Sequence, residues 1–290
     1  MQTATVVVGV DGSEAASEAV RWAAGEAARR GAVLRLVAVC EWPRPGFAAY
    51  DGLGHDVAVS PLATTRAAVD AAADLARATD ADVRIETSVR SGFALPCLLK
   101  ESRRTGLVVV GGRGCGGAPG MRVGSVAYGL AARADCPVVV VHGRAQQPDT
   151  RPVVVGVDGS AVSDAALEFA FDAAAARGVP LVAVHVRWDM ALPSSTLPAG
   201  MDRQEAEAHG REVLASCVAR WSAKYPDVPV EQVVRSDLPA QALLERASGA
   251  QMVVVGSHGR GPVRRALLGS VSHALVHQAP CPVAVVRWPR

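Results

Sequence analysis

A run of β-branched apolar residues that breaks abruptly into glycine occurs twice in this chain, and it restricts the fold more than any other feature. The first copy is LVVVGGRGCGGAPGMRVGSVAYGL at residues 107–130, and the second is MVVVGSHGRGPVRRALLGSVSHAL at residues 252–275. In each copy G-x-x-G is followed by nine residues and then by Gly-Ser. The pattern predicts a buried strand, a glycine loop and a helix, in that order.

The glycine loops indicate a phosphate-binding cradle. The first glycine pair lets the chain turn sharply off the strand and brings backbone N–H groups close to an anion, because no Cβ stands in the way. The Gly-Ser pair opens the helix, where unpaired N–H groups and the helix dipole favour negative charge. The cradles comprise Gly111, Gly114, Gly124 and Ser125 in the first copy and Gly256, Gly259, Gly269 and Ser270 in the second. The alternative is a strand-to-helix turn that binds nothing, and the repeated spacing argues against it.

Two other phosphate-binding motifs do not apply. Residues 112–117 match G-x-G-x-x-G as a string, but that fingerprint belongs on the first strand of a βαβ unit and here follows the fourth. The chain also has no G-x-x-x-x-G-K-[ST] sequence, and neither of its lysines, Lys100 and Lys224, belongs to a glycine loop. We therefore do not expect a Walker-type NTPase.

Internal repetition extends over the whole sequence. VVVGVDGS occurs at residues 6–13 and again at 153–160, an offset of 147 residues. The glycine loops are offset by 145, as are the two LVAV sequences that begin at Leu36 and Leu181. We expect the two-residue change in the turn after Gly31 and its counterpart. The repetition predicts a tandem duplication, with domains at 1–143 and 152–290 and a polar linker at 144–151.

Strand-like and helix-like segments alternate in both halves. In the first half we expect strands at 5–10, 33–39, 83–89, 107–110 and 137–141, and helices from about 13 to 30 and at 66–78, 95–102 and 125–134. In the second half we expect strands at Val153, Leu181, Val230, Val253 and Val283, and helices near Ser163, Glu205, Ala240 and Ser270. Strands that are apolar throughout and are separated by helices predict an α/β fold with a parallel sheet covered on both faces.

Ligands in such sheets bind at the carboxyl ends of the strands, where the strand order reverses. With strand order 3-2-1-4-5, this switch point lies between the first and fourth strands. It places Gly9, Val10 and Asp11 beside the first glycine loop, and Gly156, Val157 and Asp158 beside the second. Val110 and Val255 end the strands that lead into the loops.

Composition excludes several classes of function. A formal charge of +2 does not indicate the strongly basic surface that binds nucleic acid. No run of apolar residues approaches the length needed to span a membrane. The N-terminal sequence has no basic leader or cleavage site, and the six cysteines form no C-x-x-C pair. We expect a cytoplasmic protein with reduced thiols, in which Cys115 of the first glycine loop is the thiol whose redox reactivity is open.

With these residues in hand, the chain resembles a tandem universal stress protein of the ATP-binding type. G-x2-G-x9-G-S after a strand, V-x-V-D-G-S at the first strand and C-P-V at the last are similar to the pattern of that family. The resemblance covers both halves nearly end to end. It implies two Rossmann-like (HUP-type) domains, each a five-stranded parallel sheet of order 3-2-1-4-5 that holds ATP or a related adenine nucleotide. It also implies pairing through the last strands, which begin at Val138 and Val283, as an intramolecular pseudo-dimer. A homodimer of the whole chain and the protein partner are left open.

The resemblance assigns roles residue by residue. Asp11 and Asp158 would contact the base or the ribose. Phosphates and ribose would be held by Gly111, Arg113, Gly114, Gly124, Ser125 and Val126 in the first half, and by Gly256, His258, Gly259, Gly269, Ser270 and Val271 in the second. The adenine-facing valine would be Val186, in the pair His185-Val186, and the first half has Cys40-Glu41 in its place.

Other readings of single residues stay open. Each aspartate would alternatively accept backbone N–H groups at a helix start. A carboxylate near a triphosphate also suggests Mg²⁺ between them, since bare juxtaposition would repel. His273 and His277 have the i, i+4 spacing of metal ligands, but we assign no metal site. Positive charge around the loops comes from Arg113, Arg122, His258, Arg260, Arg264 and Arg265, and residues 43–61 and 189–201 are loop-like segments that would serve either as lids or as plain surface.

The residues favour a regulatory nucleotide-binding protein of stress or dormancy physiology, the physiological part resting on the resemblance alone. We assign no catalytic residue, because no lysine lies on the phosphates and no base is fixed near a nucleophile. Two alternatives remain. One is a slow ATPase or a protein that phosphorylates itself, and the other is a protein-interaction module that has lost its nucleotide.

Overall fold

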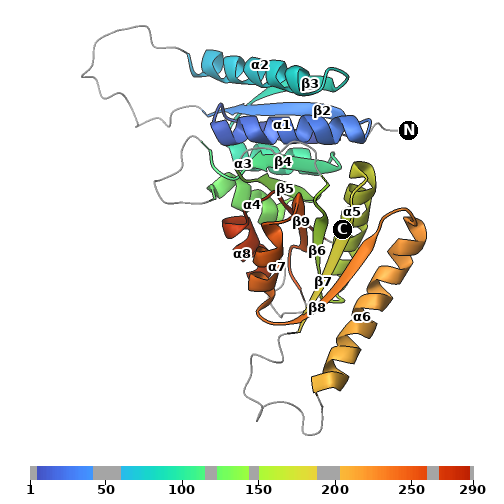
Figure 1. Cartoon of the computed structure of the whole chain (residues 1–290). Helices are drawn as coiled ribbons and strands as arrows, with labels where there is room; N and C mark the ends of the chain where they lie inside the picture. Colours follow the sequence, from blue (N-terminus) through green and yellow to red (C-terminus); the bar gives the residue numbers. More distant parts are fainter. Residues whose placement is uncertain are drawn as a thin grey trace. The chain divides into compact units, whose positions relative to one another are not determined.

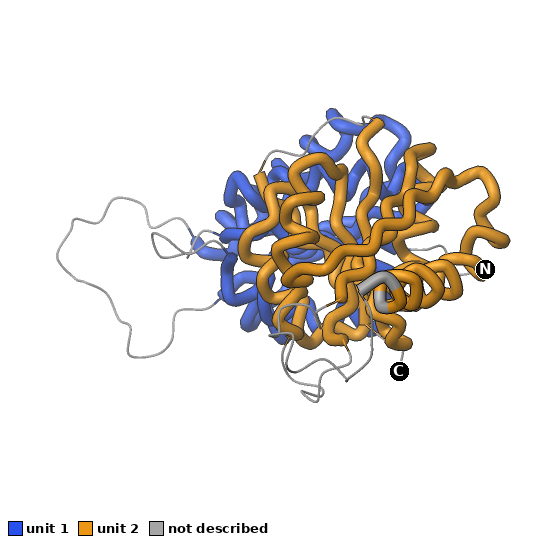
Figure 2. Tube along the Cα trace, turned by 60° about the horizontal axis from the view of Figure 1, so that its bottom comes forward, with its two compact units in different colours: residues 1–130 blue, residues 131–290 orange. Residues whose placement is uncertain are grey.

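A computed structural model of the chain describes residues 5–41, 60–114, 123–143, 150–187, 203–259 and 268–287. The chain divides into two compact units, residues 1–130 and 131–290 (Figure 2).

Unit 1 is a parallel sheet with helices on both faces. Its elements are β1 (Thr5–Val10), α1 (Glu14–Arg29), β2 (Val33–Cys40), α2 (Pro61–Thr79), β3 (Arg84–Ser91), α3 (Ala94–Ser102), β4 (Leu107–Gly111) and the first part of α4 (Ser125–Arg133). The strands lie in the order β3-β2-β1-β4, and every pair is parallel. Helices α1 and α2 lie side by side along the sheet (Figure 1).

Unit 2 repeats this arrangement and extends it. Its elements after α4 are β5 (Val138–Val141), β6 (Val153–Val157), α5 (Ala161–Arg177), β7 (Leu181–Arg187), α6 (Arg203–Lys224), β8 (Val230–Ser236), α7 (Pro239–Ala247), β9 (Met252–Gly256), α8 (Ser270–Gln278) and β10 (Val283–Val286). The strands lie in the order β5-β10-β9-β6-β7-β8. All neighbours are parallel except β5 and β10, which pair antiparallel.

The α/β fold class is therefore confirmed, and the predicted order 3-2-1-4-5 appears in β8-β7-β6-β9-β10. The strand arrangement is more complex than two separate five-stranded sheets, because β5, the last strand of the first repeat, lies in unit 2 against β10. This pairing of the two last strands was expected from the sequence. Every residue of β5 and β10 is buried, so each strand covers an apolar edge that would otherwise be exposed.

The same local signals start and end the first helix of each repeat. The Oγ of Ser13 accepts the N–H of Ala16 at 3.1 Å, and Ser160 accepts that of Ser163 at 3.2 Å. These serines are N-caps that satisfy donors left unpaired in the first turn. Gly178 ends α5 in the left-handed conformation, with φ of 63°, which glycine adopts without steric cost.

The outermost strands differ from the prediction that every strand is apolar throughout. β3 has the sequence RIETSVRS and β8 has VEQVVRS, and neither contains a buried residue. Each has only one strand neighbour. Polar side chains are common on such edges, because they discourage pairing with another chain.

Strand register corrects the predicted position of the two-residue length change. Val6 of β1 pairs with Leu34 of β2, and Val153 of β6 pairs with Leu181 of β7. Leu34 is therefore the counterpart of Leu181, at the same offset of 147 as the first strands. The LVAV sequences are out of register with each other, and the turn after Gly31 keeps its length. The change lies between the second and third strands of each repeat, because Leu34 pairs with Ile85 while Leu181 pairs with Val230.

Several residues and segments singled out in the sequence lie outside the described residues. These are Cys115, Arg122, Arg260, Arg264, Arg265, the segment 189–201, nearly all of 43–61 and most of the linker 144–151. The domain bounds 1–143 and 152–290 stay a prediction.

Candidate functional site

A cavity of about 430 Å³ lies in unit 1 at the carboxyl ends of β1, β2 and β4. Small-molecule sites typically measure roughly 300–1,000 Å³. Its lining includes every site residue predicted in the first half: Gly9, Val10, Asp11, Val110, Gly111, Arg113, Gly114, Gly124, Ser125 and Val126. The structure thus brings together residues from three separate parts of the sequence.

Glycine is required at the loop because other groups approach its backbone closely. A Cβ placed on Gly111 would lie 2.5 Å from the carbonyl carbon and oxygen of Ala15 in α1. A Cβ on Gly114 would lie 2.4 Å from Oδ2 of Asp11. Gly124 has more room, since its nearest neighbour would be 3.7 Å away, and its N–H donates to the Gly112 carbonyl at 2.7 Å. The two ends of the loop are thereby joined around the cavity.

Asp11 lies where β1 turns into α1. Its Oδ1 accepts the N–H of Ser13 at 3.0 Å, and its Oδ2 faces Gly114. Asp11 therefore accepts a backbone N–H at the start of α1, which is the alternative role predicted for it. This hydrogen bond holds the carboxylate at the edge of the cavity. The two roles are compatible, because a carboxylate can accept several hydrogen bonds at once.

The wall opposite α1 is formed by α3. Successive side chains of a strand point to opposite faces of the sheet. Gly9 faces Leu98 of α3, where a Cβ would be 2.9 Å from that side chain, whereas Gly111 faces α1. Gly9 pairs with Val37 in the register of β1 and β2, so Val37 shares the α3 face. Leu98 and Val37 both line the cavity.

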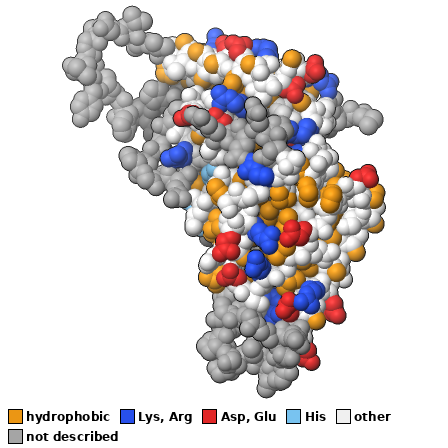
Figure 3. Space-filling model, in the orientation of Figure 1, with side chains coloured by type: hydrophobic (Ala, Val, Ile, Leu, Met, Phe, Trp, Pro, Cys, Tyr) orange, Lys and Arg blue, Asp and Glu red, His pale blue; other side chains and the backbone are white. Residues whose placement is uncertain are grey.

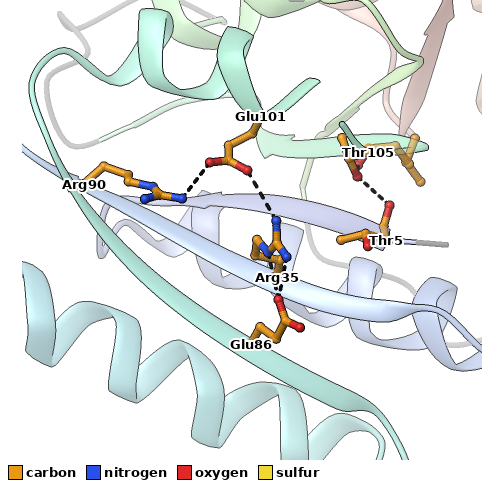
Figure 4. Close-up of polar contacts among 7 residues, drawn as sticks. Thr5, Arg35, Glu86, Arg90, Glu101 and Thr105 are labelled. Atoms are coloured by element: carbon orange, nitrogen blue, oxygen red, sulfur yellow. Dashed lines mark hydrogen bonds and ion pairs between the residues drawn. The ribbon is translucent and has the colours of Figure 1, made fainter. Parts of the chain in front are cut away.

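An ion-pair network fixes α3 on the sheet (Figure 4). Glu101 of α3 is 8% exposed and accepts from Arg90 of β3 at 3.1 Å. Arg35 of β2 lies 3.6 Å from Glu101 and donates to Glu86 of β3 at 2.7 Å. Hydrogen bonding to Glu86 raises the pKa of Arg35. Because a buried carboxylate needs such partners, the network holds the helix whose first turns form the cavity wall.

Unit 2 contains the same loop geometry. A Cβ on Gly259 would lie 2.4 Å from Oδ2 of Asp158, the same distance as in unit 1, and Asp158 accepts the N–H of Ser160 at 2.9 Å. The N–H of Gly269 donates to the Ser257 carbonyl at 2.8 Å, as Gly124 does to Gly112.

The remaining predicted residues of unit 2 follow the same plan. Gly156 faces Leu243 of α7, with a Cβ distance of 2.9 Å, and the side chain of Val255 lies 3.4 Å from the same position. Val157 ends β6, Gly256 ends β9, and Ser270 and Val271 begin α8. Val186 lies on β7, one residue beyond the end of the register shared with β6.

The two loops differ in two side chains. In unit 2 the buried Ser257 bonds through its Oγ to Nδ1 of His258 at 2.9 Å, whereas unit 1 has Gly112 and the exposed Arg113 at these positions. A further histidine, His185 of β7, donates through Nδ1 to the Val157 carbonyl at 2.8 Å. That bond joins the carboxyl ends of β6 and β7.

Comparison with known proteins identifies the family. The sequence profile of the universal stress protein family matches residues 3–142 and 150–287. The chain belongs to the universal stress protein family. A universal stress protein of Mycolicibacterium smegmatis is 40% identical over 301 residues, which cover 99% of each chain.

Solved structures of universal stress proteins show the same fold. The crystal structure of one from Archaeoglobus fulgidus covers 99% of both chains with a TM-score of 0.67 at 19% identity. Another match is a universal stress protein described in complex with cAMP, which is 30% identical over 49% of this chain and 99% of its own, with a TM-score of 0.36.

Register changes one assignment in this universal stress protein. At the offset of 147, the counterpart of Val186 is Val39, and the counterpart of His185 is Ala38. The sequence comparison with Cys40-Glu41 was therefore wrong by two residues. Val39 lines the cavity of unit 1, so both repeats have a valine at this position.

Sequence reasoning missed part of the cavity lining: Ala16, Val37, Val39, Glu41, Ala94, Leu98 and Ala127. The i, i+2 spacing of Val37, Val39 and Glu41 places them on one face of β2 and its extension. That signal is present in the sequence, but it identifies the cavity face only once the pairing of β1 and β2 is known.

Among the described residues, no group of three or more histidine, cysteine, aspartate or glutamate side chains is placed so that it could hold a metal ion. The rings of His273 and His277 lie 4.5 Å apart. Burial lowers the pKa of His277, helped by the charge of His273. Burial also raises the pKa of Cys281 to about 12, so that thiol stays protonated near neutral pH.

Within its described residues the chain has no helix that is both long enough and apolar enough to cross a membrane. On the face drawn in Figure 3, the acidic and basic side chains that are described are interspersed.

Proposed function

We propose that each unit binds ATP or a related adenine nucleotide, and that the chain acts as a regulatory nucleotide-binding protein in stress or dormancy physiology. The cavity of unit 1 is the observation that carries the proposal. It joins a glycine loop at one end to a valine-lined floor at the other, which suits a ligand with one anionic and one apolar, aromatic end.

The phosphates are proposed to lie on the glycine loop. Gly114 and Gly124 contribute main-chain atoms alone to the cavity lining, with Oδ2 of Asp11 beside Gly114, and Ser125 begins α4. Backbone N–H groups at a helix start favour an anion, and Arg113 adds a positive side chain to the lining. In unit 2 Gly259, Gly269, Ser270, Val271 and His258 are proposed to do the same.

The base is proposed to lie over β2. Neighbouring strands are about 4.8 Å apart, and β1 lies between β2 and β4. The end of β2 is therefore about 10 Å from the glycine loop, a span that the ribose and the phosphate chain can bridge. Val37 and Val39 offer an apolar floor for a purine ring, and Asp11, at the end of the intervening strand, lies where the ribose hydroxyls would pass.

Mg²⁺ is proposed to accompany the nucleotide. The ion usually binds through one or two carboxylates together with phosphate oxygens and water. Asp11 offers such a carboxylate beside the loop, and Asp158 is its counterpart. Bound Mg²⁺ would supply charge compensation between the carboxylate and the phosphates.

The remaining parts of the proposal concern setting and assembly. Free cysteines at Cys40, Cys97, Cys136, Cys217 and Cys281 fit a reducing compartment, and we propose the cytoplasm. Because β5 pairs with β10 inside the chain, the last-strand contact of a pseudo-dimer is already made. A homodimer of the whole chain would need another surface.

The proposal is tested by denaturing the purified chain and searching for released adenine nucleotide by mass spectrometry. We expect nucleotide from the native chain and none from the Gly114→Asp/Gly259→Asp variant. In that variant each new Cβ falls 2.4 Å from an aspartate oxygen, and each new carboxylate repels phosphate. Its circular dichroism should be native, because both substitutions lie in loops.

Three results would count against the proposal. A native chain that releases no nucleotide and takes up none when ATP is added would favour the interaction module. Nucleotide retained by the double variant would mean that the phosphates bind elsewhere. ATP turnover above background that is abolished by Asp11→Asn or Asp158→Asn would favour the enzyme.

A further inference from the structure

Glu41 is an exposed acidic residue on the lining of the unit 1 cavity. It follows directly after β2, which ends at Cys40. Side chains two positions apart along a strand point to the same face. Val37 and Val39 both line the cavity, so Glu41, two positions further along, lies on the same face. The glycine loop follows β4, and β1 lies between β4 and β2. Glu41, which follows β2, is therefore at the end of the cavity furthest from the glycine loop.

One carboxylate oxygen of Glu41 accepts a hydrogen bond from the protein backbone. Its Oε1 accepts the N–H of Ala94, the first residue of α3, at 3.1 Å. The N-cap of this helix, Phe93, provides no side-chain hydrogen bond, so Glu41 caps the helix from a distant part of the chain. The bond also fixes the orientation of the carboxylate. Among the described residues, Oε2 has no hydrogen-bond partner within the protein.

We propose that Glu41 determines base specificity in unit 1, by accepting a hydrogen bond from the exocyclic amino group of a 6-aminopurine. This inference rests on the proposed nucleotide function. An oxygen without a protein partner beside the base is a hydrogen-bond acceptor. It attracts the 6-amino group of adenine and repels the 6-oxo group of hypoxanthine or guanine.

The geometry favours a single amino donor over the paired donors of guanine. Guanine offers N1–H and the 2-amino group together, and these match both oxygens of a carboxylate. At Glu41 one of the two oxygens is occupied by Ala94. Oε1 is thus shared with the backbone, and Oε2 is the one carboxylate oxygen that is wholly available to the base.

The second repeat lacks both parts of this arrangement. At the offset of 147 the counterpart of Glu41 is Trp188, which lies outside the described residues. At the offset of 145 the counterpart of Ala94 is Pro239, the first residue of α7, and proline has no N–H to donate. The acceptor and the donor that orients it are therefore both specific to unit 1, and the two sites should select bases differently.

The test is a change from glutamate to glutamine in a chain that has only the first site. Gly259→Asp blocks the second site, and Glu41→Gln is then added. The amide oxygen should keep the bond from Ala94, because the opposite orientation would bring two N–H groups together. The amide NH₂ then faces the base as a donor, which suits the 6-oxo group of inosine triphosphate and not the amino group of ATP.

Binding of ATP and of inosine triphosphate is measured by isothermal titration calorimetry. A hydrogen bond to a charged group is usually worth enough to change affinity about tenfold or more. We expect the ratio of ATP affinity to inosine triphosphate affinity to fall by at least about tenfold in Glu41→Gln. In Glu41→Ala, which removes the acceptor without adding a donor, the ratio should fall less.

A matched control carries Glu41→Gln together with Gly114→Asp and an intact second site. There the ratio should be the same with and without Glu41→Gln, because only unit 2 binds. If ATP still binds in the Gly259→Asp background and Glu41→Gln leaves the ratio unchanged, the inference is wrong and the proposed function stands. If neither nucleotide binds to the native chain, the proposed function fails, and the inference with it.

Discussion

The close approach of Asp11 and Gly114 predicts a measurable energetic coupling between the two residues. In Gly114→Ala the new Cβ would lie 2.4 Å from Oδ2 of Asp11, whereas ordinary contacts begin at 3.4 Å. Relief requires a movement of about 1 Å, and because Asp11 and Gly114 are both exposed, we expect a cost toward the lower end of the roughly 1–3 kcal/mol of folding free energy that overpacking gives in a core. The carboxylate cannot move freely, because it also accepts the N–H of Ser13 at 3.0 Å.

Removing the carboxylate should remove that cost. Asp11→Ala by itself loses the bond from Ser13, at roughly 0.5–2 kcal/mol. In the double variant no oxygen opposes the new Cβ, so Gly114→Ala adds almost nothing. The two substitutions should be non-additive by roughly 1–3 kcal/mol. At about 4 °C per kcal/mol for a unit of this size, the single Gly114→Ala variant should lose about 4–12 °C in Tm.

The assay is thermal unfolding of all four proteins in the cycle, without added nucleotide. The second repeat provides an independent copy, because Gly259 and Asp158 show the same 2.4 Å distance. Gly124→Ala is the matched control, since its nearest neighbour would be 3.7 Å away, and it should change Tm little. If the two substitutions are additive within about 0.5 kcal/mol in both repeats, the loop does not approach the aspartate as described.

Three further predictions concern groups outside the cavity. Burial raises the pKa of Cys281 to about 12. In the native chain at pH 8 this thiol should therefore resist alkylation by iodoacetamide, while the half-buried Cys97 reacts. Peptide mass spectrometry measures the labelling of each cysteine, and rapid labelling of Cys281 would contradict its burial. The pKa of His277 is lowered by burial and by His273. Its contribution to stability is therefore complete above its ordinary pKa and is lost as the pH falls from there through the lowered pKa of the folded state. Between pH 7 and pH 5 the Tm of the native chain should therefore fall further than that of His277→Gln, and equal falls would refute the assignment. Glu26 of α1 is fully buried and forms ion pairs with Arg29 of the same helix and with Arg30, the C-cap of that helix. Glu26→Ala should therefore cost about 3 kcal/mol of folding free energy, measured by urea unfolding, whereas a loss below about 1 kcal/mol would show that these ion pairs are unimportant.

The strands, helices and glycine loops could be predicted because their signals are local. Runs such as Leu107–Val110 are apolar over their whole length, and glycine ends them at once. The caps Ser13 and Ser160 precede helical periodicity directly. The two-fold repetition then placed the loops at equivalent points of both halves, which a single copy would not have justified.

The register of the second strand could not be predicted in the same way. LVAV occurs in both repeats, and matching these letters moved the alignment by two residues. A shift of two residues keeps each side chain on the same face of the strand. The apolar pattern therefore fits both alignments and does not distinguish them. Only the pairing of β1 with β2 and of β6 with β7 shows that Val39 corresponds to Val186.

The cavity lining had the same limitation. Glu41, Ala94 and Leu98 come from segments that the loop motif does not include, and they meet only because α3 packs over the end of β2. The pairing of the last strands, β5 and β10, was expected as an intramolecular pseudo-dimer from the resemblance to the family. Its effect on the sheets, by which β5 lies with unit 2, was not.

The central claim is that each repeat holds one nucleotide on a main-chain loop. It is tested most directly by the stoichiometry of ATP binding in isothermal titration calorimetry, on protein stripped of nucleotide. We expect two sites in the native chain, one in Gly114→Asp, one in Gly259→Asp and none in the double variant. Two sites in the double variant, or none in a native chain with normal circular dichroism, would contradict it.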